Sequence, residues 1–522
     1  MPTVFCRHFF VGDKMKKRQI INIVNFIRAV EPREKVDLMK PVTEQIRLMK
    51  KHNLRGTFLL QYDALIMPEY SELLKELNSE QFEIGVWHEI VQPMAEKAGI
   101  EWRGRFPWDW HAHCGFSVGY TKEEREKLID VLFEDFKEIM GYYPRVFGSW
   151  FFDSHTVRYA HNKYGLDAVC NCKDQYGTDG YTLWGGYYGQ GYYPSINNVF
   201  MPAQTAENQL DVPLFRMLGS DQVYQFDSGI NVDSSEQKNQ GVISLEPVYE
   251  VAGGGLPEWV DWYMKENFNG ECLTFGYAQA GQENSFGWDS MKDGLEYQFP
   301  LFERLQKEGR IEVEPLGDTG RWYKEKYKIT PASAITAHTA YDDGNKNSVW
   351  YSSRFYRINL YGDNGKFRIR DLHIFNENFP DPYENEVCAR NEAYYETLPV
   401  ADGNRFSGNG VLAGIYFDSD NAKHDEMVFE EIDENTALIT YGNVKITLSE
   451  NNIKIESDKD FTFENRIGKD GGHLPQVKNV NEKEIKLSYN SSDYCVKLLD
   501  GVFVDNKTIR SEKCRIEAEF SV

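Results

Sequence analysis

The sequence predicts an α/β domain built on a parallel sheet, followed by an antiparallel β-sandwich. In the first part, continuous apolar runs alternate with segments of helical periodicity, as expected for buried parallel strands and their crossover helices. From ITPASAITAHTAY onward, short segments of alternating polar and apolar residues dominate, separated by turn signals such as Gly-Asn and Asn-Asn. This change of pattern places the domain boundary near Thr330 and predicts domains of residues 1–329 and 330–522.

The first half of the α/β domain shows regular strand-helix alternation. Strands are predicted over residues 20–29, 56–63, 82–88, 145–152 and 167–173. Helices are predicted over residues 40–52, 121–140 and 155–164, with a further helix opened by Pro68. Thr121 and Glu124 form the sequence signature of a capping box at the start of the helix predicted over residues 121–140. Five successive strand-helix units predict a parallel sheet with right-handed crossovers.

The pattern loosens between residues 175 and 330. The stretch YGTDGYTLWGGYYGQGYYP is expected to be a loop, too polar and flexible to form core. Strands are predicted over GVISLEPVYE, over residues 272–280 and over IEVEPL. Helices are predicted over PEWVDWYMKENF and near residues 290–308.

Bulk properties exclude several classes of protein. The formal net charge is −23 over 522 residues, so the chain lacks the basic surface that a nucleic-acid or anionic-membrane binder needs. No apolar run reaches the length of a transmembrane helix, and the N-terminal charges follow a short apolar run, the wrong order for a secretory signal. Cys170 and Cys172 have no second pair at zinc-site spacing and are expected to be structural thiols. We expect a cytoplasmic protein, and its oligomeric state stays open.

Carboxylates follow several of the predicted strands. Parallel α/β sheets place their ligands beyond the carboxyl ends of the strands, so these groups should share one mouth. Glycoside hydrolysis requires two carboxyl groups, one to protonate the leaving oxygen and one to attack or to activate water. The predicted catalytic pair is Asp153, as nucleophile or base, and Glu283, as general acid. Asp153 directly precedes a predicted helix, so a helix-cap role is an equal alternative for it.

Aromatic residues make up 14% of the chain, and many border the predicted mouth. Sugar rings pack their C–H faces on aromatic planes, while their hydroxyls need polar and charged partners. The alternative is that these aromatic residues only cover the end of the sheet or pack on the second domain. The predicted ligand is a carbohydrate, and the predicted substrate-binding residues are Arg28, Glu31, Trp87, His88, Trp150, Asp174, Trp184, Gln282 and Trp288.

Histidines offer a second possible chemistry. The main prediction involves no cofactor, and the alternative is a divalent metal such as zinc. Its ligands would be drawn from His88, His111, His113, Asp153 and His155.

Two segments carry a resemblance to a known superfamily. KHNLRGTFLLQ and FEIGVWHE resemble the second- and third-strand patterns of polysaccharide deacetylases. Their superfamily also includes family 57 glycoside hydrolases and family 38 α-mannosidases, and it implies a distorted (β/α)7-type barrel over about residues 18–330 with a following β-sandwich. His88 lies where the deacetylases keep a metal-binding histidine. The chain departs from that family in VNFIRAVEPR, which lacks the Asp pair, and at Gln92, which replaces the second histidine.

The other two families also bear on function. The zinc signature of the α-mannosidases is absent from the first strand. Family 57 enzymes use a Glu on the fourth strand and a later Asp without metal, and here Asp153 and Glu283 take similar positions with identities exchanged. The predicted function is therefore a glycoside hydrolase acting on an oligo- or polysaccharide. The alternatives are a metal-dependent carbohydrate deacetylase and a carbohydrate-binding protein without catalysis.

Overall fold

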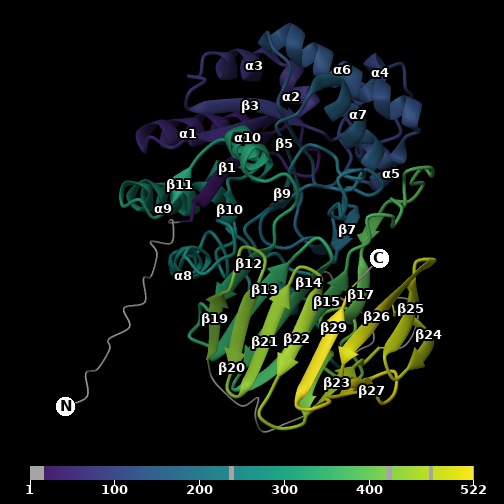
Figure 1. Ribbon diagram of the computed structural model, residues 1–522. Coiled ribbons are helices and arrows are strands. Elements are labelled where there is room, and N and C mark those ends of the chain that lie inside the picture. Colours follow the sequence, from purple (N-terminus) through teal and green to yellow (C-terminus); the bar gives the residue numbers. More distant parts are fainter. Residues whose placement is uncertain (1–16, 234–239, 419–425, 470–473, 521–522) are drawn as a thin grey trace.

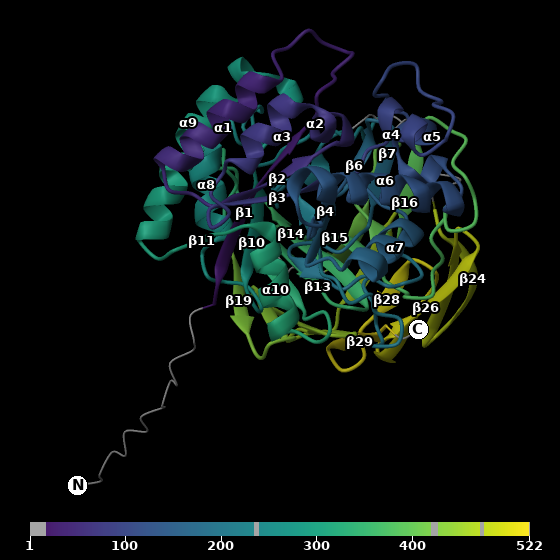
Figure 2. The same ribbon diagram turned by 90° about the horizontal axis from the view of Figure 1, so that it is seen from above.

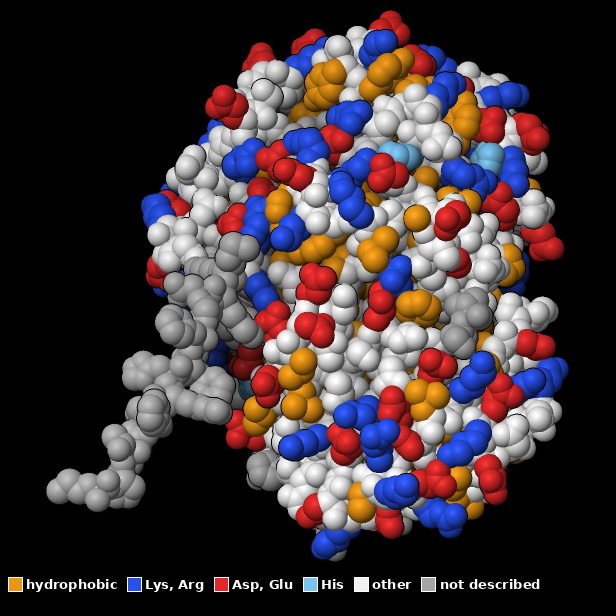
Figure 3. Space-filling model, in the orientation of Figure 1, with side chains coloured by type: hydrophobic (Ala, Val, Ile, Leu, Met, Phe, Trp, Pro, Cys, Tyr) orange, Lys and Arg blue, Asp and Glu red, His pale blue; other side chains and the backbone are white. Residues whose placement is uncertain are grey.

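The computed structural model describes residues 17–233, 240–418, 426–469 and 474–520. Figure 1 shows two layers, an α/β part that carries most of the helices and a part made of antiparallel sheets. Acidic and basic side chains are interspersed on the face seen in Figure 3, so the negative net charge is not gathered into one patch there.

The sheet of the α/β part is curled and mostly parallel. Its hydrogen-bonded order is β10-β1-β2-β3-β4-β5-β9-β8, with β11 also paired to β1. All neighbours along the path from β10 to β9 are parallel, and β8 is antiparallel at the edge. The strands are β1 (Gln19–Ile27), β2 (Gly56–Leu60), β3 (Phe82–Trp87), β4 (Val146–Gly148), β5 (Ala168–Cys172), β8 (Gly191–Tyr192), β9 (Leu214–Met217), β10 (Gly276–Ala280) and β11 (Glu312–Val313). The carboxyl ends of the parallel strands therefore open on one side.

Helices surround the outer face of this sheet, as the view from above shows (Figure 2). They are α1 (Met39–Lys51), α2 (Tyr62–Ile66), α3 (Pro68–Lys75), α4 (Gln92–Lys97), α5 (Ala112–Gly115), α6 (Lys122–Met140), α7 (Ser154–Tyr164), α8 (Pro257–Asn267), α9 (Trp288–Lys307) and α10 (Leu316–Lys326). The capping box of Thr121 and Glu124 is confirmed at the start of α6. Among the described residues, no helix combines the length and apolarity needed to cross a bilayer.

Several predicted elements differ from the structure. The strand predicted over residues 145–152 is only three residues long, because the chain leaves the sheet after Gly148. GVISLEPVYE forms no strand. Its only bridge joins Ser244 to Ser220, and Gln298 holds the carbonyl of Leu245 at 3.0 Å. The strand predicted over IEVEPL shrinks to β11, since α10 starts at Leu316.

Two antiparallel sheets form the second part. The first has the order β12-β13-β14-β15-β18-β23-β28-β27, with β17 also on β15, and the second has the order β19-β20-β21-β22-β29-β26-β25-β24. Strands of the first sheet are β12 (Ser333–Ala337), β13 (Lys346–Ser352), β14 (Tyr356–Asp363), β15 (Lys366–Ile374), β17 (Leu398–Asp402), β18 (Gly414–Asp418), β23 (Thr462–Arg466), β27 (Val502–Phe503) and β28 (Thr508–Arg510). Strands of the second are β19 (Met427–Glu431), β20 (Ala437–Tyr441), β21 (Val444–Ser449), β22 (Asn452–Glu456), β24 (Gln476–Asn481), β25 (Glu484–Tyr489), β26 (Ser492–Asp500) and β29 (Arg515–Glu519).

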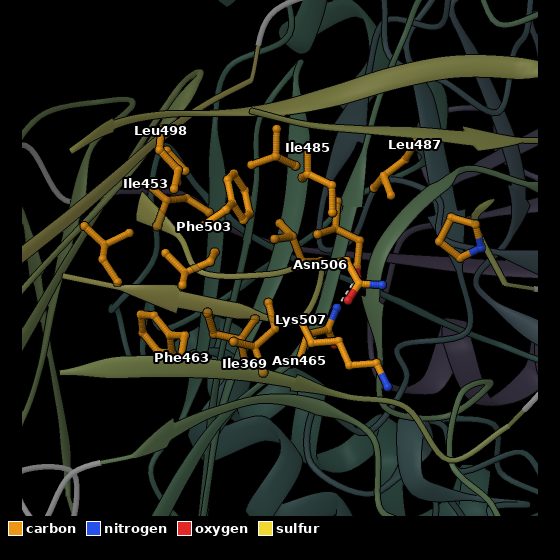
Figure 4. Close-up of a pocket in the computed structure, with 18 of the residues that line it drawn as sticks. Ile369, Ile453, Phe463, Asn465, Ile485, Leu487, Leu498, Phe503, Asn506 and Lys507 are labelled. Carbon is orange, nitrogen blue, oxygen red and sulfur yellow. Dashed lines mark hydrogen bonds between the residues drawn. The ribbon is translucent and has the colours of Figure 1, made fainter. Parts of the chain in front are cut away.

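An apolar cavity of about 130 Å³ lies between these two sheets (Figure 4). Isoleucine, leucine, valine and phenylalanine side chains from both sheets line it, with Asn465, Asn506 and Lys507 among the few polar groups. Every lining residue comes from the C-terminal part of the chain, so the cavity is separate from the mouth of the α/β sheet.

A small third sheet joins the two parts. Strand β16 (Ala393–Glu396) pairs in parallel with β7 (Tyr181–Trp184), which pairs with β6 (Gln175–Thr178). The expectation that the Gly/Tyr/Trp stretch is too polar for core was wrong, since Tyr181, Trp184 and Tyr188 are each at most 5% exposed. The reason is that the sandwich covers them. Tyr188, for example, stacks on Trp350 with ring centroids 4.0 Å apart.

Candidate active site

A small cleft opens at the carboxyl ends of the parallel strands, with a cavity volume of about 30 Å³. Val24 and Phe26 come from the second half of β1, and Trp150 comes shortly after β4. The ends of β9 and β10 supply other lining residues. The lining residues are Val24, Phe26, Trp150, Met217, Leu218, Glu246, Gln279, Ala280, Gly281, Gln282 and Glu283. Of the predicted site residues, Trp150, Gln282 and Glu283 therefore line the cleft.

Two buried carboxyl groups line the cleft in different environments. Glu246 accepts hydrogen bonds from Ser244 Oγ at 2.8 Å and from Gln282 Nε2 at 3.1 Å, and burial raises its pKa to about 7. Glu283 accepts from Ser285 Oγ at 2.7 Å and from Arg28 Nη2 at 2.9 Å. Burial also raises the pKa of Glu283, but the charge of Arg28 opposes that rise. Glu246 is therefore the better proton donor, and Glu283 the better carboxylate.

Arg28 does not line the cleft itself, but it pairs with Glu283, which does. It directly follows β1, is 1% exposed, and lies 3.9 Å from the ring centroid of Trp108. Besides Glu283, its guanidinium lies 3.3 Å from Glu89 and 3.5 Å from Glu31. Its Nε and Nη1 form no hydrogen bond within the described residues, although Nη1 is the atom that lies 3.5 Å from Glu31.

Glu89 is a buried acid that was not among the predicted site residues. It lies two residues beyond β3 and is 1% exposed, and Trp87 Nε1 donates to its Oε2 at 3.0 Å. Burial raises the pKa of Glu89 to about 7, although Arg28 acts to lower it. The predicted residue Glu31 is held differently, by a two-pronged contact with the guanidinium of Arg33.

Three aromatic side chains shape the cleft wall. Phe26 stacks on Trp87 at 4.0 Å between ring centroids, and Trp150 stands edge-on to both rings at 5.4 Å and 5.2 Å. Trp87 is fully buried, so it supports Phe26 and Glu89 rather than meeting a ligand. Trp150 is partly exposed and lines the cleft, so it is the wall residue placed to meet a sugar ring.

Asp153 lies elsewhere. It is fully buried at the N-terminus of α7, where it accepts from Thr156 N at 2.9 Å and Thr156 Oγ1 at 2.7 Å. Arg125 Nη1 donates to it at 2.9 Å. Burial opposes ionisation, but Arg125 and the hydrogen bonds hold the pKa of Asp153 below its usual range. It does not line the cleft, and Glu246 is the carboxyl group found there with Glu283.

The alternative metal ligands are not brought together. His88 is 1% exposed and packs near Phe147 and Phe152, and neither ring nitrogen has a partner in the described chain. Burial lowers its pKa to about 4. The other three are His155, which contacts Glu126 at 3.0 Å, and His111 and His113, whose rings lie 5.7 Å apart. Among the described residues, none of these side chains belongs to a group of three converging ligands.

The deacetylase-type metal centre therefore does not fit this barrel. The segment VNFIRAVEPR, which ends β1, carries no Asp, and position 92 is Gln rather than His. The guanidinium of Arg28, 2.9 Å from the cleft residue Glu283, disfavours a cation there. Within the described residues, the carboxyl ends of the parallel strands therefore hold no converging set of the predicted metal ligands.

Three other predicted residues lie outside the cleft. Asp174 is buried between the guanidinium groups of Arg216 and Arg357. Trp184 donates to Asp402 Oδ2 at 2.6 Å and is fully buried. Trp288 is 6% exposed at the start of α9 and packs in the core. Their polar groups and rings are committed to internal contacts, so these residues are not placed to hold substrate.

Comparisons with known proteins show the fold. No protein-family model matches the chain, and no curated protein matches it. A solved Parabacteroides distasonis structure, provisionally described as a glycoside hydrolase/deacetylase, is 15% identical with a TM-score of 0.55, over 74% of this chain and 92% of that one. Proteins described as polysaccharide deacetylases from Mycobacterium smegmatis and Pseudomonas aeruginosa PAO1 are 11% and 14% identical, with TM-scores of 0.36 and 0.37. Each covers 60% of this chain and 93% of its own.

The first likeness confirms an α/β fold with a curled sheet, together with a β-rich C-terminal part. The other two likenesses are too weak to carry an argument. The link to families 57 and 38 that the sequence suggested has no support among these structures.

Proposed function

We propose that this protein is a hydrolase that acts on a carbohydrate bound in the cleft, with Glu246 as general acid and Glu283 as the reacting carboxylate. The observation that carries the proposal is that two buried carboxyl groups line one cleft and only Glu283 is paired with a cation. Separated proton affinities of this kind are what acid-base cleavage of a glycosidic bond requires.

The reaction follows from these environments. Glu246, protonated near neutral pH, donates its proton to the oxygen of the leaving group. Glu283, whose ionised form Arg28 favours, attacks the anomeric carbon or takes a proton from water. Trp150 supports the face of the sugar ring, and Gln282 holds Glu246 and offers its other amide atom to a hydroxyl.

Deacetylation is the second candidate. The fold resembles that of a protein provisionally described as a glycoside hydrolase/deacetylase, so an acetylated carbohydrate is a reasonable ligand. Because the barrel mouth does not fit a metal, this reaction would use Glu283 as the base that activates water and Glu246 as the acid for the leaving group. Both candidates share the carbohydrate and the two carboxyl groups, and differ in the bond that breaks.

One experiment separates them. The purified chain is incubated with a panel of plain and acetylated oligosaccharides, and new reducing ends and free acetate are both measured. Reducing ends without acetate support the glycosidase, and acetate alone supports the deacetylase. In either case Glu246→Gln and Glu283→Gln must each remove the product. Binding of sugar without either product would overturn the hydrolase and leave a carbohydrate-binding protein.

A further inference from the structure

Three metal-ligating side chains converge where the two parts of the chain meet. Asp371 and His373 lie two residues apart on β15, so they share a face, and Asp402 on the neighbouring β17 is paired directly with Asp371. All three residues are at most 2% exposed. One ligand atom from each lies within 4.8 Å of the others, and no other group of three such residues occurs in the described chain.

The hydrogen bonds of His373 decide which ring nitrogen faces this group. The hydroxyl of Thr397 donates to the carbonyl of Gly185 at 2.7 Å, so its oxygen can only accept from His373 Nδ1, 2.9 Å away. In the neutral ring, Nε2 then carries the lone pair. This atom is buried without a hydrogen-bond partner, 3.3 Å from Asp402 and 3.5 Å from Asp371. A lone pair facing two carboxylates is unfavourable, and either a proton on Nε2 or a cation between the three groups removes this cost.

The charges around the group point the same way. Asp371 is held by both prongs of Arg357, which also pairs with Asp174, and Asp174 pairs in turn with Arg216. Arg405 attracts Asp402 and also pairs with Glu396, so four carboxylates share three guanidinium groups. A proton on His373 or a bound cation balances the remaining negative charge. Buried charge of this kind is retained where it is paired or binds a metal.

We infer that Asp371, His373 and Asp402 form a binding site for a divalent transition metal of the zinc class. One imidazole nitrogen and two carboxylate oxygens suit that class better than calcium or magnesium, which take oxygen ligands alone. Each ligand also has the supporting contact that metal sites use. Thr397 orients His373, Arg357 holds Asp371, and Trp184 donates to Asp402. A carboxylate oxygen has two lone pairs, so each can accept its hydrogen bond and still bind the ion.

The position assigns the site a structural role. Its ligands belong to the sandwich, while Trp184 and the Gly185 carbonyl come from the segment that follows β6 in the α/β part. The group is fully buried and none of it lines the catalytic cleft. The ion therefore ties the sandwich to the α/β part and takes no part in the proposed hydrolysis.

The test starts with the metal content of the purified full chain. The protein is supplied with zinc, freed of loose metal by gel filtration, and measured by inductively coupled plasma mass spectrometry. We expect about one equivalent of zinc per chain, and a lower Tm after prolonged chelation. His373→Asn keeps a donor near the Nδ1 position but removes Nε2, and should weaken zinc binding at least about tenfold. His338→Asn should retain the full equivalent, since the ring of His338 contacts Glu271 at 2.6 Å and its backbone nitrogen donates to Glu266 at 2.7 Å.

Two results would overturn the inference. A folded wild-type chain that takes up neither zinc nor manganese would show that a proton on His373 balances the charge instead. Zinc retained in full by a folded His373→Asn variant would place the metal elsewhere. If that variant does not fold, anomalous X-ray scattering is measured from wild-type crystals at the zinc edge. A peak between these three residues supports the site, and the absence of a peak there overturns it.

Discussion

Arg28 Nη2 lies 2.9 Å from Oε2 of the cleft residue Glu283, and this contact distinguishes Glu283 from Glu246. Both carboxyl groups are almost fully buried, and burial alone would favour the protonated form of each. Only Glu283 has a guanidinium at hydrogen-bonding distance. One arginine after β1 thus gives two otherwise similar glutamates different environments, and the proposed base and acid roles rest on that difference.

Replacement of Arg28 should therefore change pH dependence as well as rate. Without its charge the pKa of Glu283 rises further, so the acidic limb of the pH-rate profile in Arg28→Gln should move to higher pH. The variant also leaves Glu283, Glu89 and Glu31 without their shared cation, at a cost of about 3–5 kcal/mol in the free energy of unfolding. Steady-state rates from pH 4 to 9 and urea unfolding check both effects. Arg47→Gln, at an exposed pair with Glu44, is the control. An unshifted acidic limb would separate Arg28 from the reaction.

Glu246→Gln should remove the proton donor. The glutamine keeps the shape and one hydrogen bond, so we expect a folded variant whose kcat falls by about 10²–10⁴. Because Glu246 must be protonated and its pKa is raised to about 7, wild-type activity should fall above that pH, and this limb should vanish in the variant. Substrates with an activated aryl leaving group need less protonation and should lose much less rate. The matched control is Glu250→Gln, at an exposed position nearby. An equal loss on both kinds of substrate would contradict the acid role.

Local sequence patterns predicted the positions of some of these residues but not of others. Arg28 and Glu283 follow apolar runs that do form strands, so the rule that ligands bind beyond strand ends located them. Glu246 ends a similar run, but GVISLEPVYE is not a strand. Its place in the cleft depends on Gln298, more than fifty residues away, which holds the carbonyl of Leu245. That contact cannot be read from local periodicity.

The opposite error has a similar cause. Asp174 and Trp184 also follow β5 on the side of the mouth, and the rule predicted them to be substrate residues. In the structure β16 pairs with β7 and the sandwich closes over both, so the same positions become a buried interface. A sequence pattern shows which side of a sheet a residue reaches, but not whether another domain covers that side.

Buried acids should also make the fold less stable at higher pH. Glu89 has a pKa raised to about 7 in the folded chain, against the ordinary value near 4.5 when unfolded. Between these values the folded state binds more protons at Glu89, so the contribution of Glu89 to stability is greatest below about pH 4.5 and is lost as pH rises through 7. Glu89→Gln should flatten this part of the profile. Tm measured at half-unit intervals from pH 4.5 to 8 checks it, with Glu80→Gln, at an exposed turn, as the control. A variant with the wild-type slope would show that Glu89 is ionised throughout.

Asp153 provides the sharpest test between the sequence-based pair and the pair found in the cleft. If Asp153 is the nucleophile, Asp153→Asn abolishes turnover and leaves stability nearly unchanged. The structure instead makes it the cap of α7 and the partner of a buried Arg125, so the variant should lose about 3–5 kcal/mol of stability. Its kcat, measured well below its Tm, should stay within about threefold of wild type, since general acid-base groups contribute far more than that. Glu126→Gln, which removes only a half-exposed contact with His155, controls for general damage to this helix layer. A stable but inactive Asp153→Asn would restore Asp153 to the mechanism and remove Glu246 from it.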